Sequence, residues 1–308
     1  MPVHPVIAEF LATLSPSDAT PPNVEAWRAN GESHVPPLAE RQPAVHAIED
    51  RVARTAAGDV PLRVYAPEDG VADGLLVYFH GGAFFSGSLD THDAICRALA
   101  VESGWTVVSV GYRLAPEHAF PAGLDDCLAA LRWVAEHPAE VGWSGARLAV
   151  AGDSSGGTFA AAVAALAHDD GFDRIDRQVL LYPSVDLDFD ESRYPSLREN
   201  AVGYGLETVG LRPHNSFYLE SGADPADPRV SPIKRASLAG LPEALVITAE
   251  FDPLRDEGEA YGARLAEAGV ETTVHRYAGA PHGFAQHWGF LPEYRPVFAE
   301  VGEFLNRE

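Results

Sequence analysis

The chain has 308 residues, and its 45 aspartates and glutamates outnumber its 22 lysines and arginines, which gives a formal net charge of −23 at pH 7. Phosphate backbones and anionic lipid surfaces repel such a protein, so we expect neither nucleic acid nor a membrane as a partner. The sequence contains no apolar stretch long enough to span a bilayer and no basic N-terminal cluster, so we expect a cytoplasmic protein. Its length is enough to bury one sizeable core.

Apolar runs alternate with helical patterns along most of the chain. Strands are expected at about residues 60–65, 74–80, 106–111, 147–152, 177–182, 244–250 and 272–277. Helices are expected at about residues 92–103, 122–137, 156–168, 257–268 and 292–306. This alternation predicts an α/β fold, with a mostly parallel central sheet and helices on both faces. Residues 46–184 and 226–308 form the predicted core.

Two segments do not follow this alternation. Residues 1–45 carry short helical patches around Ile7–Leu14 and Val24–Arg28, and prolines separate them. Residues 185–225 interrupt the path from one strand to the next and combine an acidic stretch with several aromatic side chains. Composition alone allows both segments to be solvated linkers.

The strand expected at 74–80 leads into His80-Gly81-Gly82-Ala83-Phe84-Phe85. A glycine pair after a strand presents N–H groups that no side chain covers, and a hydrolase needs such donors for an oxygen that becomes negative. We predict that Gly81 and Gly82 are oxyanion donors, the alternative being a tight turn. Phe84 and Phe85 are candidates for a pocket wall, with core packing as the competing interpretation for one of them.

The sequence Gly152-Asp153-Ser154-Ser155-Gly156-Gly157 lies between an apolar run and an alanine-rich run. A strand, Gly-x-Ser-x-Gly and a helix, in that order, are the context of a nucleophile elbow. Glycines let neighbouring backbone approach the turn, which exposes the Ser154 hydroxyl at the positive end of the next helix. Ser154 is the predicted nucleophile, the Ser155 N–H is a third oxyanion donor, and Asp153 is expected to support the site by hydrogen bonding.

The strand at 244–250 ends in an acidic run, Glu250 to Glu257. A catalytic histidine needs a carboxylate that fixes its tautomer. Asp252 is favoured because it stands at the strand-to-loop junction, where Pro253 biases it towards an extended backbone. Glu250, still within the strand, and Asp256, at the start of a helix, remain alternatives.

The base must be chosen among twelve histidines. His282 follows the strand at 272–277 and the loop at 278–281, so it can lie over the same sheet edge as Ser154. His275 lies inside the strand and His287 lies beyond the loop, which makes both weaker candidates. His80 is expected to anchor the glycine turn instead.

The chain order Ser154, Asp252, His282 is the order expected of α/β-hydrolases. The chain also resembles the hormone-sensitive-lipase-like esterases, the bacterial family IV carboxylesterases of the α/β-hydrolase superfamily. Five ordered motifs carry the resemblance: His80-Gly81-Gly82, Tyr112-Arg113-Leu114-Ala115-Pro116-Glu117, Gly152-Asp153-Ser154-Ser155-Gly156-Gly157, Asp252-Pro253-Leu254-Arg255-Asp256-Glu257 and His282-Gly283-Phe284. The resemblance implies an α/β-hydrolase fold and the same nucleophile, acid, base and oxyanion donors.

The resemblance further implies that residues 1–45 and 185–225 form a helical cap over the site. Two residues depart from the family: Ala83 stands where a third glycine is usual, and Ser155 where alanine is usual. Neither change removes a group that the mechanism needs. The motif at 112–117 either shapes the site or holds its loop through a pair between Arg113 and a carboxylate, and we favour the second.

These features predict a serine carboxylesterase that hydrolyses short- to medium-chain esters through an acyl-enzyme, without metal or cofactor. An acyltransferase or amidase with the same triad is the alternative. A non-catalytic ligand receptor on the same scaffold, as in plant gibberellin receptors, is disfavoured by the presence of His282. Cys96 and Cys127 are expected to be buried thiols. A homodimer formed through an edge strand is left open.

Overall fold

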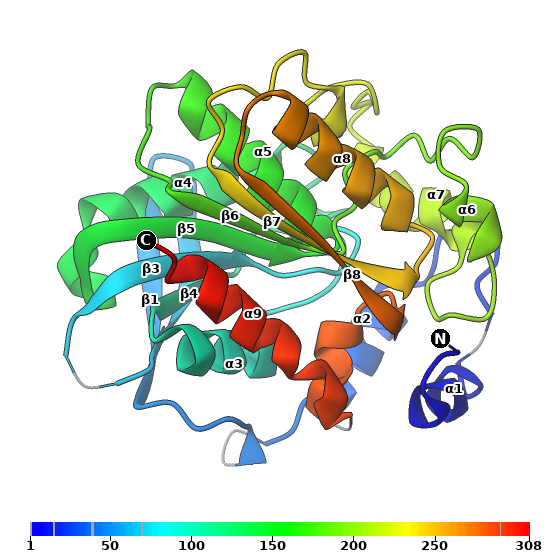
Figure 1. The fold of residues 1–308 in the computed structure, drawn as a ribbon, viewed down its shortest axis with the longest axis horizontal. Helices are drawn as coiled ribbons and strands as arrows, with labels where there is room; N and C mark the ends of the chain where they lie inside the picture. The colour runs from blue at the N-terminus through cyan, green and yellow to red at the C-terminus, as the bar shows by residue number, and fades with distance from the viewer. Residues whose placement is uncertain (1, 15, 38–39, 69, 290) are drawn as a thin grey trace.

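The structure is a computed structural model that describes residues 2–14, 16–37, 40–68, 70–289 and 291–308. Within these residues one sheet of eight strands runs in the order β1-β2-β4-β3-β5-β6-β7-β8 (Figure 1). The strands are β1 (Ala47–Thr55), β2 (Gly58–Ala66), β3 (Ala72–Phe79), β4 (Thr106–Val110), β5 (Trp143–Asp153), β6 (Arg177–Leu181), β7 (Glu243–Phe251) and β8 (Thr272–Pro281).

The sheet is mostly parallel, as the sequence predicts. The strands β4, β3, β5, β6, β7 and β8 pair in parallel, while β1 and β2 form an antiparallel hairpin and β2 pairs antiparallel with β4. The hairpin strand β1 was not predicted. Its apolar residues fall in two adjacent pairs, Ala47-Ile48 and Val52-Ala53, and most of the strand is exposed at the sheet edge, so no alternation of apolar and polar residues marks it.

Helices cover both faces of the sheet (Figure 1). One face carries α3 (Asp93–Ser103) and α9 (Pro296–Leu305), and the other carries α4 (Ala122–Glu136), α5 (Ser155–Asp169) and α8 (Arg255–Glu267). Short 3-10 helices lie at η2 (Pro138–Val141), η3 (Pro232–Lys234), η4 (Phe284–Gly289) and η5 (Pro292–Tyr294). The helix predicted at 292–306 therefore begins later, at Pro296, after a 3-10 turn.

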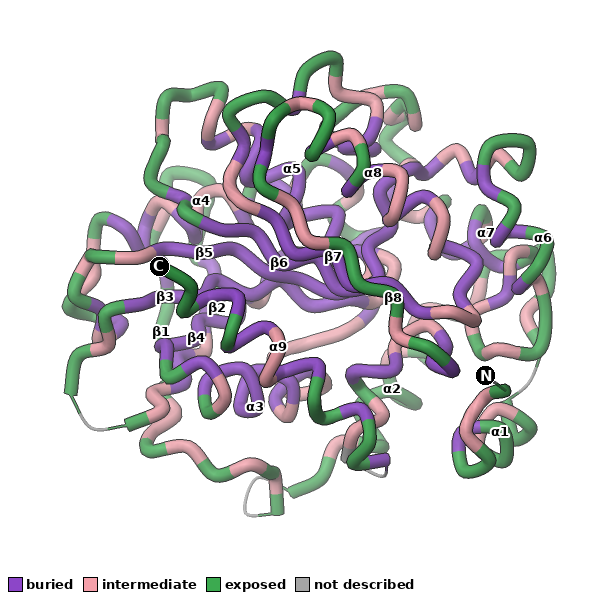
Figure 2. Tube along the Cα trace, viewed as in Figure 1, coloured by how far each residue is buried: buried purple, intermediate pink, exposed green. Residues whose placement is uncertain are grey.

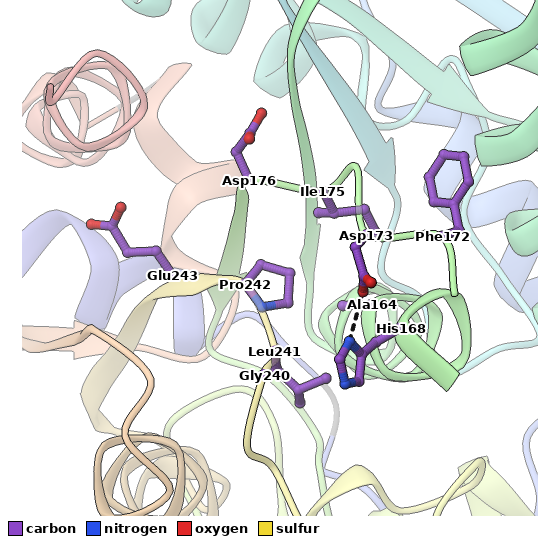
Figure 3. Close-up of a pocket in the computed structure, with 10 residues that line it drawn as sticks. All are labelled: Ala164, His168, Phe172, Asp173, Ile175, Asp176, Gly240, Leu241, Pro242 and Glu243. Atoms are coloured by element: carbon purple, nitrogen blue, oxygen red, sulfur yellow. Dashed lines mark hydrogen bonds and ion pairs between the residues drawn. The ribbon is translucent and has the colours of Figure 1, made fainter. Parts of the chain in front are cut away.

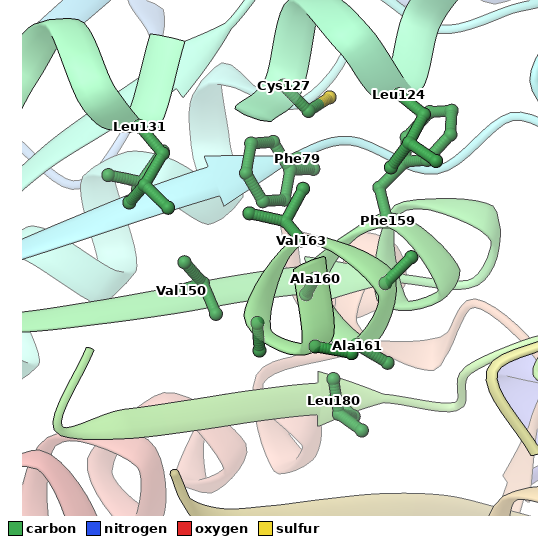
Figure 4. Packing of buried hydrophobic residues seen from close by; sticks show 14 of the residues in the cluster. Phe79, Leu124, Cys127, Leu131, Val150, Phe159, Ala160, Ala161, Val163 and Leu180 are labelled. Carbon is green, nitrogen blue, oxygen red and sulfur yellow. The ribbon is translucent and has the colours of Figure 1, made fainter. Parts of the chain in front are cut away.

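Two cores result, one on each face of the sheet. Figure 4 shows part of the larger core, where Val150 and Leu180 of the sheet meet Ala160 and Val163 of α5. The alanines of α5 are small enough to let the helix lie directly against the strands, so the backbone that follows Ser154 is held rigidly. Figure 2 shows that buried residues follow the central strands, whereas β8 at the edge is partly exposed.

The predicted buried state of both cysteines is confirmed, since Cys96 and Cys127 are buried free thiols. Burial raises the pKa of both thiols above their usual range, so they stay protonated at neutral pH. Among the described residues, no helix combines the length and the apolar character that crossing a bilayer requires.

The two segments outside the core contribute helices beyond the carboxyl ends of the strands (Figure 1). The first holds α1 (Pro5–Leu11) and α2 (Val24–Ser33), which overlap the predicted helical patches, and the second holds α6 (Ser196–Glu199) and α7 (Thr208–Leu219). They touch each other, because the Ser17 N–H donates to Glu207 at 2.8 Å and the rings of Trp27 and His214 lie 5.0 Å apart. Their assignment to a cap stays a prediction.

Candidate active site

Ser154 occupies a sharp turn between β5 and α5. Its backbone has φ 53° and ψ −121°, in the left-handed region that non-glycine residues seldom adopt. A Cβ on Gly152 would lie 2.2 Å from the Gly156 carbonyl oxygen, and one on Gly156 would lie 2.0 Å from the Phe79 carbonyl oxygen. The turn therefore tolerates no side chain at either position, which is the physical reason for the Gly-x-Ser-x-Gly pattern.

The side chains of Ser154, His282 and Asp252 meet in the structure. His282 Nε2 lies 2.9 Å from Ser154 Oγ, and His282 Nδ1 lies 2.7 Å from Asp252 Oδ2. Asp252 is 1% exposed, whereas the His282 side chain is 13% exposed and so remains open to a ligand on one side. These contacts join a hydroxyl, an imidazole and a carboxylate in series, an arrangement that can move a proton away from the hydroxyl.

The loop that carries Asp252 is fixed from two sides. Asp252 Oδ1, the carboxylate oxygen that does not face His282, accepts the Leu254 N–H at 2.8 Å, which orients the carboxylate. The Asn200 side chain donates to the carbonyl oxygens of Glu250 and Asp252, at 3.1 and 3.0 Å. Asn200 is a supporting residue that the sequence did not single out, because it lies in the segment at 185–225 and no motif marks it.

The other candidate acids are occupied elsewhere. Glu250 accepts the Gly279 N–H at 2.6 Å, and Asp256 accepts the Ser196 N–H at 2.7 Å. Asp252, in contrast, is the one of the three that contacts the imidazole of His282.

The alternative histidines are likewise placed away from the hydroxyl. His275 lies in β8 and contacts Glu300 at 2.9 Å. His287 packs against Phe10 with ring centroids 5.2 Å apart, and burial, followed by the charge of His282, lowers its pKa to about 4. Of these rings, His282 alone reaches Ser154.

The backbone N–H groups of the loop after β3 differ from the sequence prediction. The Gly81 N–H donates to Asp153 Oδ1 at 2.8 Å, so the prediction that Gly81 is an oxyanion donor is wrong: the carboxylate occupies that N–H. The next two N–H groups, of Gly82 and Ala83, make no hydrogen bond to the residues that the structure describes. Gly82 has φ 127°, and a Cβ there would lie 2.2 Å from the Ser86 carbonyl oxygen, so glycine is required at this position.

Ser155 holds this loop against the turn that carries Ser154. Its hydroxyl accepts the Phe84 N–H at 3.3 Å, a contact that alanine could not make. Its own N–H belongs to the first turn of α5, where a helix leaves its N–H groups without partners inside the helix. The N–H groups of Gly82, Ala83 and Ser155, which have no hydrogen-bond partner among the described residues, thus come from two segments that the Ser155 side chain ties together.

Asp153 is the buried support that the sequence predicts. It is 1% exposed and accepts the Tyr78 hydroxyl at 2.6 Å besides the Gly81 N–H, while His92 Nε2 lies 3.5 Å away. Burial by itself raises the pKa of this carboxyl, but the charge of His92 and the hydrogen bonds from its partners outweigh burial and leave the pKa at about 2. Asp153 is therefore ionised at neutral pH although it lies inside the protein.

His80 anchors the glycine turn, as predicted. Its ring stacks on Tyr112 with centroids 4.2 Å apart, and its Nδ1 lies 2.8 Å from the Gly81 carbonyl oxygen. The Tyr112 hydroxyl donates to the His80 carbonyl oxygen at 2.6 Å. Burial, followed by the charge of His92, lowers the pKa of His80 to about 3, so the ring is neutral at physiological pH.

The Arg113 lock is confirmed. The Arg113 guanidinium donates to both carboxylate oxygens of Asp126, at 2.8 and 2.7 Å, and thereby holds the loop at 112–117 against α4. Such a two-point contact has the geometry that makes an arginine pair specific as well as favourable.

The two phenylalanines of the loop have different surroundings. Phe84 stacks on Tyr218 with centroids 3.9 Å apart and meets Phe159 edge-on at 5.1 Å, so its ring packs in the core, the competing interpretation for one of the two phenylalanines. Phe85 faces Trp27 and Phe217, at 5.9 and 5.1 Å, which belong to the helices beyond the sheet edge.

A separate cavity of 380 Å³ lies at the other end of α5 (Figure 3). His168 and Asp173, which are 2.8 Å apart, contribute to its lining. Since α5 rises about 1.5 Å per residue, this cavity lies about 20 Å from Ser154 and does not belong to the site. In the described part of the chain, no group of three or more histidine, cysteine or acidic side chains could hold a metal ion.

The strand order of the sheet is that of the α/β-hydrolase-fold proteins. This class also brings a serine, a histidine and an aspartate together at the carboxyl ends of the strands, as seen here. A family model described as "alpha/beta hydrolase fold" matches residues 76–286. Esterase LipI of Mycobacterium tuberculosis is 42% identical over 261 residues, which cover 82% of this chain and 80% of that protein. Carboxylesterase NlhH of the same organism is 40% identical over 289 residues, covering 92% and 88% respectively.

A solved structure is also similar. It is the hyperthermophilic esterase of the archaeon Pyrobaculum calidifontis, with a TM-score of 0.92 and 38% identity over 99% of this chain and 98% of that chain. The chain belongs to the hormone-sensitive-lipase-like carboxylesterases of the α/β-hydrolase superfamily. The fold class and the family that the sequence predicts are both confirmed.

The neutral, buried His80 predicts a specific loss of stability in acid. The folded pKa of about 3 lies below the usual 6.5, so between these values the unfolded chain binds more protons, and the free energy of unfolding decreases as the pH falls. His80 should account for about 2 kcal/mol of the decrease from pH 7 to pH 5. Urea unfolding of wild type and His80→Gln at both pH values measures it. An unchanged pH dependence in the variant would contradict the assignment.

Proposed function

We propose that this protein hydrolyses carboxylic esters through a covalent acyl-enzyme formed on Ser154. The observation that carries the proposal is the series of contacts from Ser154 Oγ to His282 Nε2, 2.9 Å, and from His282 Nδ1 to Asp252 Oδ2, 2.7 Å. A serine hydroxyl is a weak nucleophile at neutral pH and needs a base within hydrogen-bonding reach. Membership in a family of carboxylesterases supports esters as the substrate class.

In the first half-reaction, Ser154 Oγ attacks the ester carbonyl carbon while His282 Nε2 takes its proton. Asp252 keeps the proton on Nδ1 of His282 and stabilises the imidazolium. When the tetrahedral intermediate collapses, Nε2 gives its proton to the departing alkoxide, and the alcohol leaves. The acyl group then remains on Ser154 as an ester.

The negative oxygen of the intermediate is held by the N–H groups of Gly82, Ala83 and Ser155. Their freedom from other partners among the described residues, and their position beside Ser154 on two adjoining segments, support this set. Fixed donors of this kind stabilise the transition state without a reorganisation of solvent. The set differs from the sequence prediction in that Ala83 replaces Gly81.

Water completes the cycle. A water molecule in the place of the alcohol gives a proton to His282 Nε2 as its oxygen attacks the acyl carbon. The second intermediate collapses, the carboxylic acid leaves, and the proton returns to Ser154 Oγ. Water is thus the second substrate, and no step involves oxidation or reduction.

The helices α1, α2, α6 and α7 act in this proposal as a cap that limits the length of the substrate. The rings of Trp27 and Phe217 reach down from these helices to Phe85, which is fully buried next to the oxyanion loop. Apolar walls closed in this way suit short and medium acyl chains and exclude water from the reacting atoms.

Substitution of the three relay residues tests the proposal. Ser154→Ala and His282→Gln should each lower kcat for p-nitrophenyl butyrate by about 10⁶-fold, because they remove the nucleophile and its base. Asp252→Asn should lower it by about 10⁴-fold, because the imidazole loses the carboxylate that fixes its tautomer. His275→Gln is the matched control, since this ring contacts Glu300 in β8 and should leave kcat near the wild-type value. Circular dichroism checks that each variant is folded. Full activity of folded Ser154→Ala would refute the proposal.

The closed ring contacts predict a limit on chain length. For p-nitrophenyl esters from acetate to palmitate, kcat/KM should be highest at octanoate or below and lower by about tenfold or more for palmitate. Phe85→Ala removes one wall and should move the optimum towards longer chains. An optimum at palmitate in the wild type would contradict the role given to the cap.

A further inference from the structure

Helix α2 lies against the oxyanion loop, residues 82–86, although it buries few apolar side chains. None of its residues is fully buried. Its sequence therefore provides little apolar area for attachment, and specific side chains must fix its position. One is Glu32, which accepts the Ser88 hydroxyl at 2.6 Å, and another is Trp27, whose ring lies 5.9 Å from that of Phe85.

The most extensive contacts of α2 come from Arg28. Its Nε donates to the Phe85 carbonyl oxygen at 2.7 Å, and its Nη2 donates to the Ala115 carbonyl oxygen at 2.8 Å. The same guanidinium pairs with both carboxylate oxygens of Glu117, at 2.9 and 2.8 Å. The hydrogen bond from Arg28 is the leading cause that lowers the pKa of Glu117 to about 2. One side chain thus joins three segments that are far apart in sequence.

These contacts act on the backbone of the oxyanion loop itself. The N–H groups of Phe85 and Ser86 donate to the Gly82 carbonyl oxygen, at 3.1 and 2.9 Å, and close a turn around Ala83. The Ala115 N–H donates to the Phe84 carbonyl oxygen at 3.0 Å. Arg28 therefore holds the end of the turn that presents the Gly82 and Ala83 N–H groups, together with the segment that supports it.

We propose that Arg28 is a positioning residue that couples the seating of α2 to the geometry of the oxyanion donors. The inference rests on the proposed function of the loop. A planar guanidinium can bind a carboxylate with two N–H groups and still direct others to two carbonyl oxygens, whereas the single ammonium of lysine has no such fork. When Arg28 is removed, the turn loses its fixed end, and the N–H groups shift relative to the oxygen that becomes negative.

Two substitutions at this position test the coupling. Arg28→Ala should lower kcat for p-nitrophenyl butyrate by about tenfold or more, because a small misplacement of the donors costs rate, while KM changes by about twofold or less. Arg28→Lys keeps the charge and should still lose several-fold in kcat. A trifluoromethyl ketone, which forms an oxyanion adduct with the serine, should bind more weakly by the same factor as kcat falls.

Arg235 provides the matched control. It is similarly shielded and also combines a two-point carboxylate contact, to Asp169, with a carbonyl contact, to Ser237, but it lies at the far end of α5. Arg235→Ala and Arg235→Lys should leave kcat and ketone affinity within about twofold of wild type. Folded protein is quantified by circular dichroism, and kcat is expressed per folded molecule.

The outcomes separate this inference from the function on which it rests. Ester turnover by the wild type establishes that function before any variant is made. Unchanged kcat in folded Arg28→Lys, or a rise in KM alone in either Arg28 variant, would then overturn the inference, because α2 would only be seated by Arg28. A decrease in kcat without a parallel loss of ketone affinity would overturn it as well.

Discussion

The arrangement around Ser154 depends on one buried negative charge. Asp153 is 1% exposed and ionised, and a buried carboxylate is costly to the fold unless all of its partners are in place. Those partners come from β3, from the loop that follows it, from the residue before α3 and from η4, which follows His282: they are Tyr78, Gly81, His92 and Gln286. A single side chain thereby holds all four places in register with the turn that carries Ser154.

The sheet brings the remaining groups to that charge. The carboxyl ends of its parallel strands lie along the same side of the sheet. The residues that follow β5, β7 and β8 therefore meet there as Ser154, Asp252 and His282. The close approach of Gly156 to the Phe79 carbonyl oxygen sets how near the turn that carries Ser154 comes to the loop after β3. Arg28 holds the opposite side of that loop, so the site is fixed both from the sheet and from the helices above it.

Much of this could be predicted because the informative residues lie next to strand ends in motifs with a local physical cause. The glycines at 152 and 156 and the acid at 252 are of this kind. Gly81 was assigned wrongly because its N–H is taken by Asp153, 72 residues away in sequence, and a contact of that range leaves no local signal. The roles of Phe84, Asn200 and Arg28 escaped the sequence for the same reason, because each depends on which distant segment packs against the residue. The edge strand β1 lacks an apolar alternation and so has no recognisable pattern.

The central claim is that the environment of Ser154, and not merely its sequence motif, makes this hydroxyl reactive. Reaction of the whole protein with an alkyl fluorophosphonate at neutral pH, followed by peptide mass spectrometry, tests this claim most directly, since the reagent needs an activated serine. We expect one adduct per molecule, located on Ser154, and its loss in His282→Gln. A main adduct on another serine, or undiminished labelling of Ser154 without the imidazole, would contradict it.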